Sequence, residues 1–237
     1  MKIRLYLTDN ITAGECSLNP EMSHYLCRVL RVRTKAEILL FNADSGEWRG
    51  RVIAAHPKQT RITIEEQTRE PETTKRLKLY FAPIKKSRIS TIFAMATELG
   101  VTELQPVKTR FTHNDVGRED KVTRQLIEAT EQCERLDVPK LLPLISWHKF
   151  CAEQQDSTEN LLACVESGSA RSMMEIVQQS LSPQQILIGP EGGFSAEEHA
   201  ILQSWTHCVP ITLGTRILRA ETAVAAALSQ WQLCFGQ

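Results

Sequence analysis

The sequence has no long hydrophobic run and no recognisable targeting segment. No apolar stretch approaches the roughly 20 residues that a membrane-spanning helix needs. The amino-terminal MKIRLYLTDN places charges on both sides of a short apolar run and contains no small-residue cleavage site, which argues against a signal peptide. These absences predict a cytoplasmic protein that is not bound to a membrane.

Paired cysteines and the common phosphate-binding motifs are also missing. The seven cysteines are odd in number, are scattered, and never occur as C-x-x-C. This pattern argues against a disulfide framework and a zinc site, so we expect buried free thiols and no bound metal. Neither G-x-x-x-x-G-K-[ST] nor G-x-G-x-x-G occurs, which argues against the usual nucleotide-phosphate loops.

The chain has no net charge, but its charges are unevenly distributed. Residues 1–88 contain 17 Lys and Arg against 10 Asp and Glu, and residues 89–237 contain 11 against 18. A basic part followed by an acidic part is typical of proteins that bind a polyanion, although the same split also arises without nucleic acid.

Two domains are predicted from the order of the apolar patterns. Residues 1–70 contain short β-branched runs separated by turn signals, and four or five strands of this length favour a small β-barrel. The polar segment 66–76 contains Pro71 and is the best domain boundary. In residues 77–237 strands alternate with helices, which predicts a parallel α/β domain. Its expected elements include strand 77–82, helix 89–99, strand 101–107, a helix 119–136 ended by Pro139, strand 161–165 with a small-residue loop at 167–169, and helix 171–179.

Two groups of cations lie in segments without acidic residues. In the first group, Pro20 after Asn19 predicts a helix start, and an inward apolar face leaves a basic strip outside. The second group follows the expected strand 77–82, where α/β proteins form ligand sites. Phosphate contact and a solvated surface both fit, and the missing counter-charges favour phosphate contact. The inward face is Tyr25, Leu26, Val29 and Leu30, the basic strip is Arg28, Arg31, Arg33 and Lys35, and the second group is Lys85, Lys86 and Arg88.

The loop Ile188-Gly-Pro-Glu-Gly-Gly-Phe194 follows an apolar strand and precedes a helix. Gly192 and Gly193 allow positive φ and close approach to the main chain. Ser195 and Glu198 form a capping-box pattern, so we expect the helix to begin at Ala196. Because Glu191 stands where a phosphate would need a cation, a neutral or cationic ligand fits better, and a tight structural turn is the alternative.

A second strand, loop and helix occupy residues 209–235. The loop 214–219 contains Ile217 and Leu218 between polar positions, where their apolar atoms would be exposed unless they cover a flat ligand such as adenine. Apolar residues at 224, 228, 231 and 235 have helical spacing. The many alanines of residues 220–227 allow close approach of another backbone, within the chain or across a subunit interface.

Taken together, these motifs resemble the SPOUT class of RNA methyltransferases. The similarity is greatest to the RsmE family, which methylates N3 of one uridine in small-subunit ribosomal RNA, and it covers nearly the whole chain. It is carried by Ile188–Phe194, Leu213-Gly-x-Arg-Ile-Leu-Arg-x-Glu-Thr-Ala223, Glu98-Leu-Gly-Val101, Glu131-Gln-Cys-x-Arg135 with Val138-Pro139, and His24-x-x-x-Arg28-Val-Leu-Arg31. The chain departs from the family at Met95, where a lysine is usual, and at Glu134, where a small residue is usual.

The resemblance implies a fold, a cofactor and an assembly. The fold is an N-terminal PUA-like β-barrel and a C-terminal α/β SPOUT domain with a deep trefoil knot. The methyl donor is S-adenosylmethionine, the substrate is 16S rRNA within the small ribosomal subunit, and the enzyme is a homodimer. The implied cofactor-binding residues are Ile188, Gly189, Gly193, Leu213, Gly214, Ile217 and Leu218, and the implied RNA-binding residues are Arg28, Arg31, Lys35, Lys85, Lys86, Arg88 and Arg135.

Uracil N3 becomes a good nucleophile only after it loses its proton, so the reaction needs positioning and charge stabilisation. We expect Arg219 to steady the charge on the ring oxygens, and Glu221 to anchor Arg219 or to accept the proton. Simple pairing of Glu221 with the helix dipole is as compatible with its position. Two other functions remain open from the sequence: methyl transfer to another RNA atom, and RNA binding without catalysis.

Overall fold

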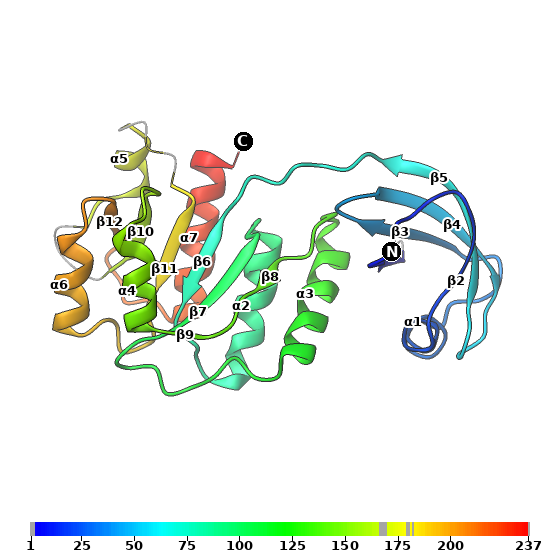
Figure 1. The fold of residues 1–237 in the computed structure, drawn as a ribbon, viewed down its shortest axis with the longest axis horizontal. Helices are drawn as coiled ribbons and strands as arrows, with labels where there is room; N and C mark the ends of the chain where they lie inside the picture. The colour runs from blue at the N-terminus through cyan, green and yellow to red at the C-terminus, as the bar shows by residue number, and fades with distance from the viewer. Residues whose placement is uncertain (1–2, 166–169, 179–180, 182, 237) are drawn as a thin grey trace. The chain divides into compact units, whose positions relative to one another are not determined.

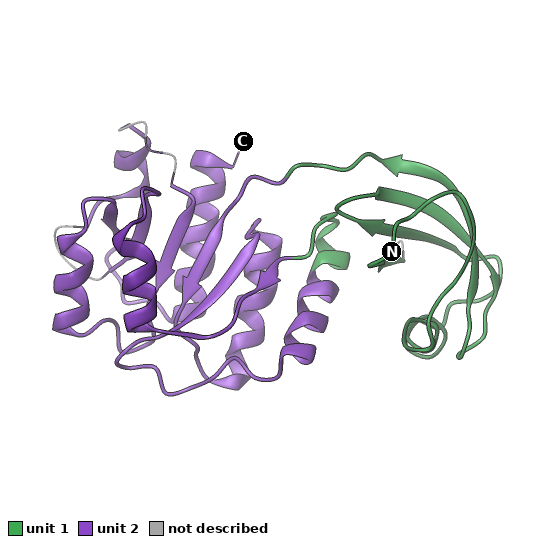
Figure 2. Cartoon of the chain, in the orientation of Figure 1, with its two compact units in different colours: residues 1–73, 130–138 green, residues 74–129, 139–237 purple. Residues whose placement is uncertain are grey.

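The computed structural model describes residues 3–165, 170–178, 181 and 183–236. The chain forms two compact units, residues 1–73 with 130–138, and residues 74–129 with 139–237 (Figure 2). The change of unit at residues 73 and 74 falls within the polar segment 66–76, although the last strand of the first unit extends to Arg69. The β-rich first part and the parallel α/β second part that the sequence predicts are both present.

The first unit is built on a five-stranded sheet with the order β1-β3-β4-β5-β2 (Figure 1). β1 and β3 are parallel, and the other pairings are antiparallel. The short strand β2 was not predicted, because its side chains are exposed or half-buried and give no apolar alternation. The strands are β1 (Arg4–Tyr6), β2 (Gly14–Ser17), β3 (Glu37–Asn42), β4 (Gly46–Ala54) and β5 (Arg61–Arg69).

The helical segment of the first unit begins as predicted and then widens. The Asn19 side chain accepts a hydrogen bond from the Met22 amide at the start of α1 (Pro20–His24). The chain continues as a π-helix, η1 (Tyr25–Val29), in which the Leu30 amide donates to the Tyr25 carbonyl. The wider turn moves Val29 off the inner face, and 60% of Val29 is exposed. The expected inward orientation of Val29 is therefore wrong, whereas Leu26 is buried as expected.

Residues 130–138 are held in the first unit by the buried side chain of Arg4. Its guanidinium donates hydrogen bonds to the backbone carbonyls of Thr130, Glu131 and Arg135. Glu47 balances the charge at 2.9 Å. The Glu131 side chain also accepts a hydrogen bond from the Tyr6 backbone amide of β1, which adds a second link between β1 and this segment.

The second unit contains a parallel sheet with the order β12-β10-β11-β6-β7-β8, and β9 pairs with β7. Phe81 packs edge to face on Phe93 of α2, while its neighbour Tyr80 packs on Phe150 of α4. Adjacent strand residues point to opposite faces, so helices cover both sides of the sheet (Figure 1). The strands are β6 (Lys78–Phe81), β7 (Glu103–Lys108), β8 (Lys140–Leu141), β9 (Ile145–Ser146), β10 (Leu161–Cys164), β11 (Gln185–Ile188) and β12 (Cys208–Ile211). The helices are α2 (Lys86–Glu98), α3 (Glu119–Cys133), α4 (Trp147–Gln155), α5 (Met173–Val177), α6 (Ala196–Ser204) and α7 (Ala220–Phe235).

Three helix boundaries differ from those predicted. α2 begins at Lys86, three residues before the predicted start at 89, so Lys86 and Arg88 lie in its first turn. α3 ends at Cys133 rather than running to residue 136, because Glu134 adopts a left-handed backbone with φ of 62°. α5 begins at Met173, since Arg171 forms a β-bridge with Ile211 instead. The loop at 167–169 and the expected end of this helix at 179 lie outside the described residues.

Candidate active site

A cavity of about 540 Å³ lies where β10, β11 and β12 end. These three strands are parallel neighbours, with Cys164 in register with both Ile188 and Ile211, so the loops that follow them leave the sheet at one edge. The cavity is lined by the ends of these strands, by the loops after β11 and β12, and by α6 and α7. All seven residues that the family resemblance assigns to the cofactor lie on its wall: Ile188, Gly189, Gly193, Leu213, Gly214, Ile217 and Leu218.

The sequence did not identify the contribution of β10 to this wall. Cys164 and Val165 line the cavity together with Phe194, His199 and Thr212. The buried strand at 161–165 was predicted, but its position between β11 and β12 follows from strand order, which local patterns do not contain. Burial raises the pKa of the Cys164 thiol far above its ordinary value, so this side chain is an uncharged thiol near neutral pH.

The loop after β11 is fixed at both of its ends. A methyl group added to Gly189 would lie 3.1 Å from the Phe194 ring, so a side chain at this position would require the ring to shift by a few tenths of an ångström. The predicted capping box is present, since the Glu198 amide donates to Ser195 Oγ and the Ser195 amide donates to Glu198 Oε2. The expected helix start at Ala196 is confirmed, and the loop backbone is held open towards the cavity.

The loop after β12 exposes apolar atoms at the cavity rim. Ile217 is 79% exposed although it is a large aliphatic residue, and Leu218 is half-buried. Gly214 has φ of 120°, a conformation that L-residues rarely adopt, and its amide donates to Thr212 Oγ1. This rim of the cavity therefore presents uncovered apolar side chains, as expected for a flat ligand.

Arg88 joins the loop after β11 to the first turn of α7. Its Nη1 donates to both carboxylate oxygens of Glu221 at 3.0 and 3.1 Å, and its Nη2 pairs with Glu191 in the other loop. Arg88 is therefore not the free cation that the sequence suggested for RNA contact. The charge of Glu191 is also balanced by Arg88, so this carboxylate does not argue against a phosphate ligand in the way that the sequence suggested.

Glu221 is held as a carboxylate by these contacts. Partial burial alone would raise the pKa of Glu221, but hydrogen bonds from its own backbone amide and from Arg88 outweigh the burial and lower the pKa below 4.5. Arg219 contributes only a weaker charge effect, so Arg88, rather than Arg219, is the main partner of this carboxylate. Arg219 occupies the position before α7 and is exposed, and its carbonyl accepts a hydrogen bond from the Ala223 amide.

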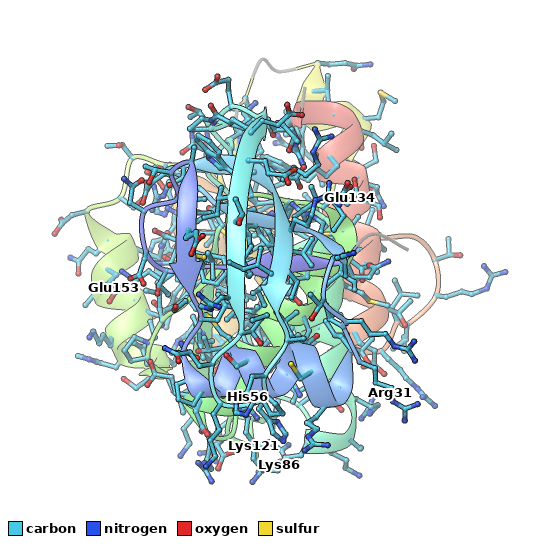
Figure 3. The ribbon with its side chains drawn as sticks, turned by 90° about the vertical axis from the view of Figure 1, so that its right-hand side faces the viewer. Arg31, His56, Lys86, Lys121, Glu134 and Glu153 are labelled. Carbon is cyan, nitrogen blue, oxygen red and sulfur yellow. The ribbon has the colours of Figure 1, made fainter. Side chains whose placement is uncertain are left out.

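The other cations predicted to contact RNA are mostly exposed. In the first unit, Arg28, Arg31 and Lys35 are exposed, and Figure 3 shows Arg31 extending outward. In the second unit, Lys85 and Lys86 are exposed, and the nearest carboxylate to Lys86 is Asp115 at 3.7 Å. Arg135 differs, because its side chain is only 12% exposed and pairs with Asp137 at 2.6 Å. RNA contact by Arg135 would require this pair to open.

Two further features limit the possible chemistry of the described residues. Within them, no group of three His, Cys, Asp or Glu side chains is arranged to hold a metal ion. All seven cysteines are free, but only Cys208 is buried, so the expectation of buried thiols holds in part.

Among the described residues, no helix is both long enough and apolar enough to cross a membrane.

Comparison with known proteins agrees with this architecture. Residues 71–232 match the family model of the RNA methyltransferase domain, and residues 18–65 match that of the RNA methyltransferase PUA domain. Ribosomal RNA small subunit methyltransferase E of Rickettsia conorii is 32% identical over 219 residues, which cover 89% of this chain and 86% of the relative.

Two solved structures are similar over almost their full length. Ribosomal RNA small subunit methyltransferase E from Neisseria gonorrhoeae, solved with S-adenosyl methionine, is 28% identical, covers 100% of this chain and 99% of its own, and has a TM-score of 0.88. A putative methyltransferase from Legionella pneumophila, solved with SAM, is 27% identical, covers 98% of both chains, and has a TM-score of 0.85. Since the domain model spans most of the chain and the Rickettsia relative is alike over nearly its whole length, the chain belongs to the ribosomal RNA small subunit methyltransferase E family.

Proposed function

We propose that this enzyme transfers the methyl group of S-adenosylmethionine to N3 of one uridine in 16S rRNA. The observation that carries the proposal is the cavity at the ends of β10, β11 and β12, with its glycine-rich lining and uncovered apolar side chains. The two similar structures solved with this cofactor support the same assignment.

The residues present fit this cofactor. A volume of about 540 Å³ is within the range of small-molecule sites. The exposed Ile217 and the half-buried Leu218 offer apolar surface for the adenine, and Leu213 and Gly214 bring the backbone of the loop to the wall of the cavity. When bound, S-adenosylmethionine supplies a methyl group on a positively charged sulfur.

Arg219 and Glu221 have different roles in this proposal. Arg219 is exposed beside the loop that lines the cavity, so its guanidinium can hydrogen-bond the uracil oxygens and stabilise negative charge on the deprotonated ring. Glu221 is a weak base because its pKa is lowered, and it is already bound to Arg88. We therefore assign Glu221 to positioning rather than to proton transfer.

RNA delivery is assigned to the exposed cations. Arg28, Arg31 and Lys35 of the first unit and Lys85 and Lys86 of the second would contact phosphates. The 16S rRNA would be bound within the small ribosomal subunit, which places the enzyme in the cytoplasm. The homodimer and the deep trefoil knot implied by the family resemblance remain part of the proposal.

The cofactor and the substrate are tested separately. Calorimetric titration with S-adenosylhomocysteine should show one site per chain, and no binding would contradict the cofactor assignment. Mass mapping of 16S rRNA from a strain that lacks the gene should show one uridine without its methyl group. A missing methyl group on a ribose or a purine instead would contradict the uridine assignment.

Substituting Arg219→Ala should abolish methylation and leave S-adenosylhomocysteine binding within about twofold of wild type, because Arg219 stabilises the substrate rather than the cofactor. A methylation assay with a known amount of S-adenosylmethionine measures the first effect, and calorimetry with S-adenosylhomocysteine measures the second. Turnover near the wild-type rate would show that Arg219 is not the stabilising group.

A further inference from the structure

We propose that the turn Thr109–Thr112 presents Phe111 as a stacking surface for the target uracil, next to the cofactor cavity. This inference rests on the proposed function and adds the site of the base to it. The turn follows β7 and belongs to the TRFTHND segment, which neither the fold nor the cofactor site explains.

Phe111 is unusual among the aromatic residues of this protein. All Phe, Tyr and Trp residues lie in the described part of the chain, and Phe111 is the only one of them that is exposed. Its exposed fraction is 41%. A single exposed apolar residue needs no special explanation by itself. The case for a stacking surface therefore depends on where Phe111 lies and on how its turn is held in place.

Phe111 lies directly against the rim of the cavity. Gly192 is part of the cavity wall. A methyl group added to Gly192 would lie 3.2 Å from Phe111 Cβ and 3.4 Å from its Cγ. The absence of a side chain at Gly192 thus lets the base of the Phe111 side chain approach the cofactor loop closely. A base stacked on this ring would be next to the cavity in which the methyl donor is proposed to bind.

The turn that carries Phe111 is fixed by buried hydrogen bonds. The Thr109 amide donates to Thr112 Oγ1 at 3.1 Å, and the two threonine hydroxyls are 2.8 Å apart. The Arg110 amide donates to Glu198 Oε1 at 2.8 Å, and Glu198 is 4% exposed. The other oxygen of Glu198 accepts a hydrogen bond from Ser195, so one buried carboxylate joins this turn to the cofactor loop. The aromatic ring is therefore presented by a preorganised support.

The surrounding charge indicates what stacks on the ring. Arg110 is exposed beside Phe111, and Lys85 and Lys86 are exposed after the neighbouring strand β6. Figures 1 and 3 show the amino-terminal ends of α2 and α3 at one edge of this unit, with Lys86 and Lys121 extending from it. An aromatic ring among cations suits a nucleic acid base whose phosphates are neutralised nearby. Because methylation at N3 requires the base to leave its pairing, the occupant is an unpaired uracil.

Phe111→Ala should lower kcat/KM for methylation at least tenfold and leave S-adenosylhomocysteine affinity within about twofold, since stacking a base contributes a factor of this size. Phe111→Trp should retain most of the activity, and Phe111→Leu should not, because a flat ring is required. Leu144→Ala is the matched control: Leu144 is 39% exposed in the same unit, and its loss should change neither quantity.

A fluorescent base reports stacking on Phe111 directly, because its fluorescence would not depend on Phe111 if this residue had only a structural role. An RNA with 2-aminopurine in place of the target uridine should be quenched by the wild-type enzyme and less quenched by Phe111→Ala. The proposal is overturned if Phe111→Ala methylates like wild type, if Phe111→Leu is as active as Phe111→Trp, or if Phe111→Ala changes the oligomeric state. If the wild-type enzyme itself methylates no uridine, the proposed function fails instead.

Discussion

At the scale of single residues, the Arg88 guanidinium connects two loops that are far apart in the sequence. It binds Glu191 after β11 and Glu221 at the start of α7, and its side chain is 26% exposed. Arg88→Ala leaves both carboxylates without this partner and removes the link between the loop after β11 and the start of α7. We expect affinity for S-adenosylhomocysteine to fall about tenfold in calorimetry, because the loops would no longer be held together.

Lys86→Ala is the control for this prediction. Lys86 lies in the same segment, but its side chain is 74% exposed and contacts neither loop carboxylate. Its loss should leave S-adenosylhomocysteine affinity unchanged. Equal affinities for Arg88→Ala and the wild type would remove the assigned role of Arg88 in shaping the cavity.

The lowered pKa of Glu221 has a consequence for stability against acid. A carboxyl group whose pKa is lower in the folded state stabilises the fold above its ordinary pKa of 4.5 and loses this effect as the pH falls through the folded value. The difference in free energy of unfolding between wild type and Glu221→Gln should thus be constant near neutral pH and shrink below about 4.5. Urea titrations at several pH values measure it, and a difference that grows in acid would be contrary to this account.

At the scale of an element, the end of α3 carries a strained residue. Glu134 has φ of 62°, and its carbonyl accepts a hydrogen bond from Arg69 at 2.7 Å. Glycine adopts this conformation without the cost that a side chain imposes. Glu134→Gly should therefore raise the free energy of unfolding by about 0.5–1 kcal/mol.

Glu128→Gly is the matched control, because Glu128 is an exposed residue inside the same helix. The Glu128→Gly variant should have a free energy of unfolding about 1 kcal/mol lower than that of wild type, since glycine is unfavourable in a helix interior. Urea unfolding of both variants makes the comparison. Destabilisation by Glu134→Gly would show that its side chain, rather than its backbone, matters at this position.

Elements with strong local patterns could be predicted from the sequence. The apolar spacing of α2, the capping box of α6 and the proline in the first position of α1 are local signals, and the structure follows them. The π-helix was not predictable in the same way. An α-helical turn would place Val29 on the inner face, and only the structure shows that the wider turn leaves Val29 exposed. The two loops of the cavity were identified, because glycines and uncovered apolar residues are also local features.

At the scale of the whole molecule, contacts between distant segments were not predictable. Arg88 was expected to be a free cation, since nothing near it in the sequence is acidic, yet its partners are more than 100 residues away. Arg4 similarly holds backbone carbonyls about as far along the chain. The place of β10 beside the cavity also depends on strand order. Such pairings come from topology, which local patterns do not encode.

The uneven charge of the whole molecule predicts a salt-dependent interaction with RNA. Lys85→Ala with Lys86→Ala should weaken RNA binding and reduce the slope of log affinity against log salt by about 1 to 2, since each lost phosphate contact removes nearly one unit. Filter binding at several salt concentrations measures this. Lys140→Ala with Lys149→Ala removes the same charge from exposed positions outside both groups of cations and should keep the slope. An unchanged slope in the first variant would contradict phosphate contact there.

Methylation of uridine N3 in 16S rRNA can be tested directly with purified components. The enzyme is incubated with S-adenosylmethionine and with small ribosomal subunits from the strain that lacks the gene. Nucleosides from the recovered 16S rRNA are then identified by mass spectrometry. We expect one 3-methyluridine per subunit, formed by the wild-type enzyme and absent with Arg219→Ala. No methylated nucleoside, or a methyl group on a ribose or a purine, would contradict it.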